Sequence, residues 1–444
     1  MNIAELLNII NWTVFLPLNF AIFLIASFLF RPLSYGSFDV GWIVVAAQSV
    51  AVTLVAYLDL STHGYFKDHA IFISLAFLSF LLGARAAQAT LLYIRPRRPQ
   101  RSAFSNDVLA TLKHLSRILV FLQILIITLI MLRMSTQGLP IFAEDPEIAK
   151  VDVNSGGFGI ITRILTPSIT LAFSIVFLLQ GLGYLRGARL FLALLPALVA
   201  LLASGSKGAF LTVLVSYTAV QAYLMGYVRG YRPPSSARVV IYGAIGILGY
   251  AAVVLLLRAI GTGEDDPWLF VLTTFGVRLI AFGDGVFYYF GNDLFRTLSF
   301  NPSDYFWDYA LAPLFALLRL VEYPISLGLK ISGEMFGQEK LGPNPTMYVE
   351  GYAYFGALGG LFYAACLGLI FQMLRSNVFS RFSSVTFWNF IGFTLLFSLA
   401  QVVASDMLLF HAELVNSILL VSLVWLAHQV IRVLFQPRLR VKLA

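Results

Sequence analysis

Charged residues are scarce in this chain, and their scarcity limits the class of protein. Only 12% of the 444 residues are Asp, Glu, Lys or Arg, whereas 59% are hydrophobic. An ordinary soluble domain has about a quarter of its residues charged. One aqueous core cannot cover so much apolar surface, so we expect lipid to be the solvent for much of the chain. The composition therefore excludes an ordinary soluble globular protein.

Cysteine is also nearly absent, because Cys366 is the single one and lies within an apolar run. One thiol excludes a disulfide framework and a thiolate metal site. His411 has no second histidine at metal-ligand spacing, so we expect no metal and no other cofactor. The N-terminus lacks the basic segment and cleavage site of a signal peptide, so the first apolar run is expected to remain.

Long apolar runs dominate the sequence instead. A helix needs about 20 apolar residues to cross the hydrocarbon core. About eleven runs approach this length: Trp12–Phe30, Gly41–Leu60, Ala70–Tyr93, Arg117–Leu132, Ile160–Gln180, Leu190–Ala203, Ala209–Tyr227, Val239–Leu257, Met347–Met373, Thr386–Val403 and Leu414–Phe435. The sequence thus predicts an all-α fold, a polytopic transmembrane helical bundle that forms one integral membrane domain over residues 1–444.

The basic residues set the predicted orientation. A net charge of +8 would fit a nucleic-acid partner, but the Lys and Arg residues gather in short loops between apolar runs. Such loops are cytoplasmic by the positive-inside rule. They lie within 94–117, the main basic loop, and at Arg186, Arg189, Arg229, Arg232, Arg238, Arg375, Arg381, Arg432, Arg438, Arg440 and Lys442. We therefore predict an N-terminus outside, a C-terminus in the cytoplasm and no nucleic-acid partner.

The face opposite these loops is the predicted outer face, and residues 258–346 form its longest loop. The runs Trp268–Phe290 and Tyr305–Leu329 within it resemble helices. They fit re-entrant or interfacial helices, or one extra pair of spans that would give thirteen. No repeated half is visible, which argues mildly against a transporter.

Several cations lie within or beside predicted spans, where charge is disfavoured and often functional. Arg163 follows the glycine-rich entry at 156–159, which fits either anion binding at a helix start or snorkelling to the interface. Arg85 and Arg133 lie near helix ends, where we expect snorkelling. Lys207 lies in the small-residue turn 204–208, expected to be recessed below the headgroups, and Arg278 has no local charged partner.

The segment before the ninth apolar run contains a carboxylate with two readings. Pro345 fixes the entry to the helix, and Thr346 can cap it. Glu350 then falls in the first turn, where the helix dipole favours a carboxylate. The alternative is that Glu350 acts as a base at the mouth of a cavity. Asp406, in the last outer loop, is a second candidate for that role.

Three short stretches carry a resemblance to a known family. They are the turn 204–208 with Lys207, the late-loop stretch 273–278 that ends in Arg278, and Asn344-Pro345-Thr346 followed by Glu350 and Phe355-Gly356. With the overall topology, these stretches resemble the O-antigen polymerase (Wzy-type) family of bacterial oligosaccharide repeat-unit polymerases. The resemblance implies a GT-C-like, multi-pass protein of the bacterial inner membrane whose active site faces the periplasm.

The resemblance also implies an activity and roles for particular residues. Such an enzyme joins undecaprenyl-diphosphate-linked oligosaccharide units without a metal, so that cations must stabilise the departing diphosphate. We assign diphosphate binding to Arg163, Lys207 and Arg278, with Arg258 and Arg319 in reserve. Glu350 is the expected base, followed by Asp406. Expected sugar contacts are Tyr288, Tyr305, Trp307 and Asn344. Expected partners are the lipid-linked oligosaccharide, membrane lipid and a chain-length regulator protein.

Two other functions share this lipid-linked substrate. An O-antigen ligase would transfer the glycan to lipid A core. An exporter or flippase would carry it across the membrane, and it should show charge on both leaflets and two related halves. The candidate residues here gather toward the predicted outer face, which favours the polymerase.

Overall fold

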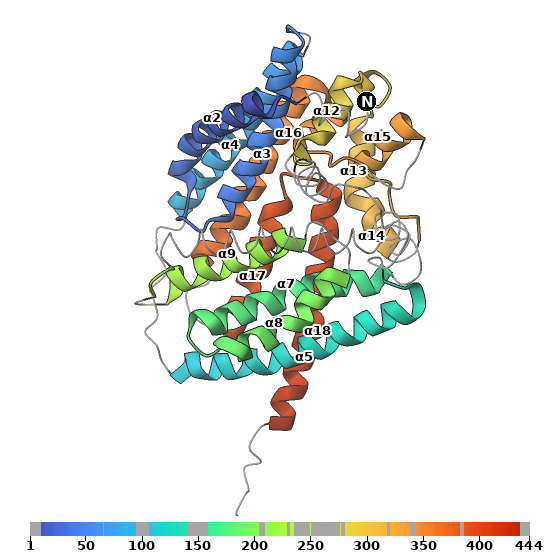
Figure 1. The fold of residues 1–444 in the computed structure, drawn as a ribbon. Helices are drawn as coiled ribbons and strands as arrows, with labels where there is room; N and C mark the ends of the chain where they lie inside the picture. Colours follow the sequence, from blue (N-terminus) through green and yellow to red (C-terminus); the bar gives the residue numbers. More distant parts are fainter. Residues whose placement is uncertain are drawn as a thin grey trace, which may run out of the picture.

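A computed structural model describes residues 10–64, 66–94, 106–139, 159–203, 209–228, 231–234, 249, 276, 280–317, 320–337, 342–381 and 386–435. The elements assigned in these ranges are all helices, as Figure 1 shows. The predicted run Val239–Leu257 falls largely outside the described residues. The other ten predicted runs each coincide with a helix. The all-α prediction is therefore confirmed for the part of the chain that the structure describes.

Seven of the described helices are long and apolar enough to cross a membrane: Trp12–Leu33, Val40–Ser61, Lys67–Thr90, Thr111–Thr136, Ile161–Gly181, Met347–Phe379 and Met407–Val433. Gly187–Ala203 and Phe387–Val402 are shorter apolar helices. Many apolar side chains on these helices point outward, and Phe28, Leu82 and Phe362 are 74%, 67% and 73% exposed. Such an apolar exterior is what a lipid environment requires. The chain is a polytopic α-helical membrane protein, and the totals of eleven or thirteen spans remain predictions.

The helices form three neighbouring groups in Figure 1. The first contains α2 (Trp12–Phe30), the short η1 (Arg31–Leu33), α3 (Val40–Ser61), α4 (Lys67–Ile94) and α16 (Met347–Arg381). The second contains α5 (Asn106–Gln137), α7 (Gly159–Gly181), α8 (Gly187–Ala203), α9 (Ala209–Tyr227), α17 (Phe387–Val402) and α18 (Met407–Phe435). α5 begins at Asn106, so the second half of the predicted basic loop 94–117 is helical.

The third group is a set of short helices at the upper right of Figure 1. It contains α12 (Asp284–Gly291), η3 (Leu294–Arg296), α13 (Pro302–Phe306), the π-helical η4 (Trp307–Leu311), α14 (Ala312–Leu317) and α15 (Leu327–Phe336). The predicted run Tyr305–Leu329 is therefore broken into pieces too short to span a bilayer. Its described residues do not support the thirteen-span alternative, because residues 320–326 before α15 are not helical.

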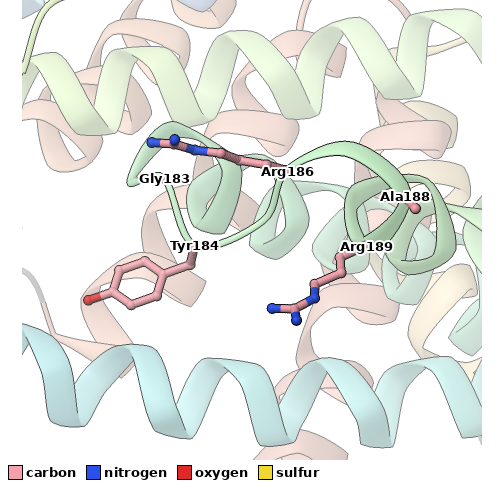
Figure 2. Close-up of a pocket in the computed structure, with 5 residues that line it drawn as sticks. All are labelled: Gly183, Tyr184, Arg186, Ala188 and Arg189. Atoms are coloured by element: carbon pink, nitrogen blue, oxygen red, sulfur yellow. The ribbon is translucent and has the colours of Figure 1, made fainter.

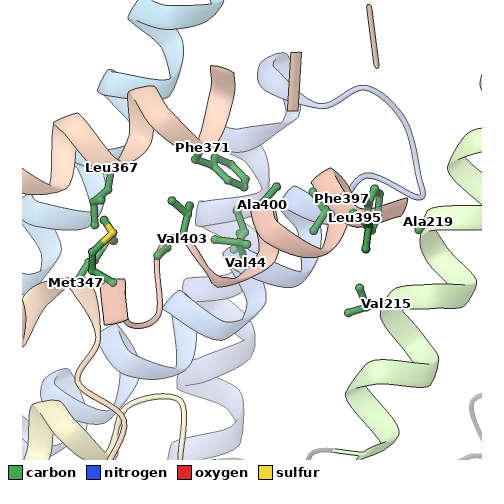
Figure 3. Packing of buried hydrophobic residues seen from close by; sticks show 14 of the residues in the cluster. Val44, Val215, Ala219, Met347, Leu367, Phe371, Leu395, Phe397, Ala400 and Val403 are labelled. Carbon is green, nitrogen blue, oxygen red and sulfur yellow. The ribbon is translucent and has the colours of Figure 1, made fainter. Parts of the chain in front are cut away.

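The two longest helices of the first group pack backbone against backbone. A Cβ atom on Gly368 of α16 would lie 1.9 Å from the carbonyl oxygen of Phe80 in α4. A Cβ on Gly83 of α4 would lie 1.9 Å from the carbonyl oxygen of Ala365. Small residues permit such close approach between membrane helices, where van der Waals packing replaces the hydrophobic effect. Figure 3 shows the neighbouring apolar packing of Phe371, Ala400 and Val44 from α16, α17 and α3.

A fully buried ion pair joins the other end of α16 to the start of α3. Arg375 pairs with Asp39, and both side chains are 0% exposed. Arg375 Nε donates to Asp39 Oδ1 at 3.0 Å, and Nη1 donates to Gln372 Oε1 at 2.6 Å. The expectation that Arg375 belongs to an exposed cytoplasmic loop is wrong. The reason is that α16 continues to Arg381, so Arg375 lies on the helix and faces the core.

Candidate functional site

A break in α16 determines where Glu350 lies. Gly356 has φ 68° and ψ −172°, so α16 consists of two helical parts that meet there. In a straight helix, Glu350 and Tyr363 would be separated by about 20 Å along the axis. Their side chains nevertheless hydrogen-bond, 13 residues apart. A Cβ on Gly351 would lie 3.1 Å from the Cα of Gly360, so glycines let the two parts fold closely together.

The carboxylate of Glu350 is enclosed by protein. Glu350 is 1% exposed. Oε2 accepts a hydrogen bond from the Tyr363 hydroxyl at 2.8 Å, and Oε1 accepts one from the backbone N–H of Met407 at 3.1 Å. Two different helices, α16 and α18, thus supply the donors that a buried carboxylate needs.

Asp406 lies directly before Met407, so the two predicted carboxylates are neighbours in space. Asp406 is partly buried, and its Oδ1 accepts from the backbone N–H groups of Leu408 at 2.7 Å and Leu409 at 3.1 Å. These bonds cap α18. Burial raises the pKa of Asp406 from 3.8 to about 6, although the two N–H donors act in the opposite direction. No described residue bonds to its Oδ2, which leaves that oxygen available to a substrate.

Arg163 approaches the same region from α7. Its guanidinium carbon lies 5.3 Å from the centre of the Tyr323 ring. Burial raises the pKa of Tyr323, Arg163 lowers it, and the charge of Asp406 raises it. Arg163 and Asp406 are therefore both close enough to Tyr323 to act on it. The structure brings together Glu350, Asp406 and Arg163 among the residues predicted from the sequence.

Four predicted phosphate-binding cations lie outside the described residues. They are Lys207, Arg258, Arg278 and Arg319, and their roles remain predictions. Part of the context of Arg278 is described, because a turn at 281–283 precedes α12 and ends at Gly283. The predicted helical run Trp268–Phe290 is therefore interrupted just before Asp284.

The predicted sugar contacts differ in how much surface they offer. Tyr288 is 5% exposed, and its ring packs edge-on against Phe287 and Phe336, so the ring has no free face for a sugar. Tyr305 is partly buried and stacks on Tyr309 at 4.7 Å. Trp307 is 46% exposed.

Asn344, the fourth predicted sugar contact, has an exposed side chain that hydrogen-bonds to the backbone of the turn 281–283, which precedes α12. Its side-chain amide donates to the Ala281 carbonyl at 3.0 Å. Its backbone N–H donates to the buried carboxylate of Asp284 at 3.1 Å. This contact holds the segment before α16 against α12, and the sequence reasoning did not identify it.

Arg133 is a further basic residue whose position the sequence reasoning missed. It was expected to snorkel, but it is only 5% exposed, and its Nε has no hydrogen-bond partner among the described residues. It lies one turn before the end of α5, which packs against α7, the helix that carries Arg163. Arg85, by contrast, is exposed and donates to Gln88 at 3.1 Å. Its expected position near a helix end is wrong, because α4 continues nine residues beyond it to Ile94.

One surface pocket lies away from the carboxylates, at the turn between α7 and α8. It encloses about 640 Å³ and is lined by Gly183, Tyr184, Arg186, Ala188 and Arg189. Figure 2 shows Tyr184 and Arg189 extending to one side of this turn and Arg186 to the other. These residues are exposed and belong to the predicted cytoplasmic face, so the pocket is separate from the candidate site.

Comparisons with known proteins do not assign the chain to a family. No family model, no curated protein and no solved structure matches the chain. Within the described ranges, no group of three or more His, Cys, Asp or Glu side chains is arranged to hold a metal ion. The fold defines a multi-pass helical membrane protein with a buried acidic and tyrosine-rich site, and its function has to be argued from that site.

Proposed function

We propose that the chain is a membrane glycosyltransferase that polymerises undecaprenyl-diphosphate-linked oligosaccharide repeat units at the predicted outer face. The observation that carries this proposal is that Arg163 and Asp406 both lie near Tyr323, while Asp406 directly precedes Met407, whose N–H donates to Glu350. A cation beside a lipid diphosphate would stabilise the charge that develops as the sugar departs. A nearby carboxylate would take the proton of the attacking hydroxyl.

Burial favours Asp406 over Glu350 as the group that touches the substrate. Oδ2 of Asp406 has no bond from the described residues, whereas both oxygens of Glu350 are occupied and covered. A pKa of about 6 leaves Asp406 mostly unprotonated at neutral pH, as a general base must be. This order reverses the ranking that the sequence favoured. Lys207 and Arg278 would add further positive charge at the diphosphate.

The proposal is tested in cells that carry the gene and make the corresponding polymer. Arg163→Ala and Asp406→Asn should abolish the ladder of chain lengths on lipid A core and leave single repeat units. Lys207→Ala and Arg278→Ala should have the same effect. Arg85→Ala is the matched control, because Arg85 is an exposed arginine within α4 that bonds to Gln88 and to no residue of the site, and it should leave the ladder intact.

Three results would contradict the polymerase. Normal ladders in both Arg163→Ala and Asp406→Asn would remove these residues from any catalytic role. Finished polymer that stays on the lipid carrier and never reaches lipid A core would indicate a ligase. Single repeat units trapped on the cytoplasmic side of the carrier pool would indicate an exporter or flippase.

A further inference from the structure

Two histidines face each other where α5 packs against α18. The ring centres of His114 and His428 are 5.2 Å apart, and the rings meet edge-on. Nδ1 of each ring is enclosed by protein and has no hydrogen-bond partner among the described residues. Nε2 of each ring also lacks a partner there, but it is not enclosed. A neutral imidazole with its hydrogen on Nε2 is a donor, so both rings are available to a hydrogen-bond acceptor.

Two arginines follow these histidines on the same helix faces. Arg117 comes three residues after His114 in α5, and Arg432 comes four residues after His428 in the last turn of α18. Residues at these spacings are neighbours on a helix surface. Arg432 is exposed and forms no ion pair with a described residue. Both arginines belong to the predicted cytoplasmic face. This basic group of two histidines and two arginines repels a metal cation and fits a phosphate.

An apolar groove adjoins the basic group and leads from it toward the middle of α18. The groove has a volume of about 490 Å³ and is lined by Trp388 of α17 and by Val421, Ser422, Trp425 and Leu426 of α18. Trp388 lies edge-on to His428 with ring centres 5.7 Å apart. From Val421 to Arg432, α18 rises about 16 Å, which is close to half of the roughly 30 Å hydrocarbon core. The groove and the basic group therefore match the acyl chain and the headgroup of one lipid in length and in order.

We propose that the groove and the basic group bind an anionic phospholipid, with an acyl chain beside Trp425 and the phosphate at His114, His428 and Arg432. Basic pockets between membrane helices on the cytoplasmic side bind anionic headgroups. Tryptophan favours the level of the membrane interface, which is where this groove meets the basic group. A zwitterionic headgroup would also bring a quaternary ammonium, which the arginines repel. The lipid site lies on the predicted face opposite the candidate active site, so it does not depend on the reaction proposed above.

The test measures quenching of tryptophan fluorescence in the purified full-length protein in lipid nanodiscs. Phosphatidylglycerol and phosphatidylcholine, each brominated on the acyl chain, are compared, and the quenching that is lost in Trp425→Phe reports the groove. Arg432→Gln removes one charge at an exposed position. His428→Phe removes the donor but keeps the ring, which stacks on Phe387 at 4.7 Å. Arg85→Gln is the matched control, because Arg85 is an exposed arginine of α4, outside the helix group that contains α5 and α18.

Brominated phosphatidylglycerol should quench the wild-type protein at a mole fraction lower than brominated phosphatidylcholine by about tenfold or more, as two arginines near an anionic headgroup allow. Arg432→Gln should reduce this preference by about fivefold, the factor for one such arginine. His428→Phe should also reduce it, and Arg85→Gln should leave it unchanged.

Equal quenching of the wild-type protein by the two lipids would overturn the proposal. An unchanged preference in both Arg432→Gln and His428→Phe would overturn it as well, and so would an equal reduction in Arg85→Gln, since that would indicate the overall surface charge. Loss of the preference when inorganic phosphate is added at constant ionic strength would assign the basic group to free phosphate and overturn the lipid.

Discussion

The ion pair between Arg375 and Asp39 predicts a large loss of stability when a single heavy atom is exchanged. Asp39→Asn keeps the size of the side chain and the oxygen that caps α3 by accepting from Gly41 at 2.9 Å. It removes the negative charge and leaves a guanidinium that is 0% exposed without its counter-ion. Breaking a buried pair from one side costs about 3–5 kcal/mol.

The contacts that remain around Arg375 place the expected loss at the lower end of that range. Its Nη2 still donates to the Leu33 carbonyl at 3.1 Å, and Gln372 still accepts from Nη1. The rings of Phe30 and Phe371 each lie 4.8 Å from the guanidinium carbon. We therefore expect a loss of about 3 kcal/mol, which lowers the ratio of folded to unfolded protein by more than about a hundredfold.

The assay is unfolding of the purified protein in mixed micelles as the fraction of denaturing detergent rises, followed by tryptophan fluorescence. Asp304→Asn is the control, because Asp304 also accepts a helix-capping bond, from Asn301 at 3.0 Å, but lies in an exposed capping box. Its expected loss is below about 1 kcal/mol. An Asp39→Asn loss no larger than that of Asp304→Asn would refute the reasoning that Arg375 depends on its counter-ion.

Two further predictions concern packing and pH. Gly368→Ala should destabilise the fold by about 1–3 kcal/mol, because its Cβ would meet the Phe80 carbonyl. Gly226→Ala in α9 is the control, because a Cβ there meets open space, and it should stabilise the fold by about 0.5–1 kcal/mol. Equal effects of the two substitutions in the same unfolding assay would contradict the close approach of α16 to α4 at Gly368. Because the pKa of Asp406 is about 6 in the fold and 3.8 when exposed, the folded state binds this proton more tightly, so stability should fall as pH rises through this window. Asp406→Asn should flatten that slope, and an unchanged slope would show that the proton is bound elsewhere.

The sequence was sufficient for the helices and for part of the site, because both depend on local chemistry. Apolar runs of sufficient length located the described spans, Glu350 was singled out from its position at a helix start, and Asp406 from its place in the last predicted outer loop. The break at Gly356 was missed because the apolar run continues through it, so that hydropathy shows one helix. The cluster of Gly351, Gly356, Gly359 and Gly360 was the available signal, since several glycines in one helix indicate a bend or a close approach.

The contacts that could not be predicted join residues far apart in the chain. Asp39 and Arg375 are separated by 336 positions, and a single sequence does not show which distant charges pair. Arg133 was expected to snorkel because it lies near a helix end, but its burial depends on how α5 packs against its neighbours. The hydrogen bond from Tyr363 to Glu350 depends on the two parts of α16 meeting, which is a property of the tertiary fold.

The hydrogen bond from Met407 to Glu350 also has a consequence for how the protein is made. The N-terminal part of α16 carries an acidic group into the apolar interior, but one of its donors belongs to α18, the last helix described. During synthesis, this donor is made 57 residues after Glu350. A nascent chain that stops before residue 407 therefore leaves Glu350 with the hydroxyl of Tyr363 and without the Met407 N–H. Docking of α18 completes the hydrogen bonding of this buried carboxylate.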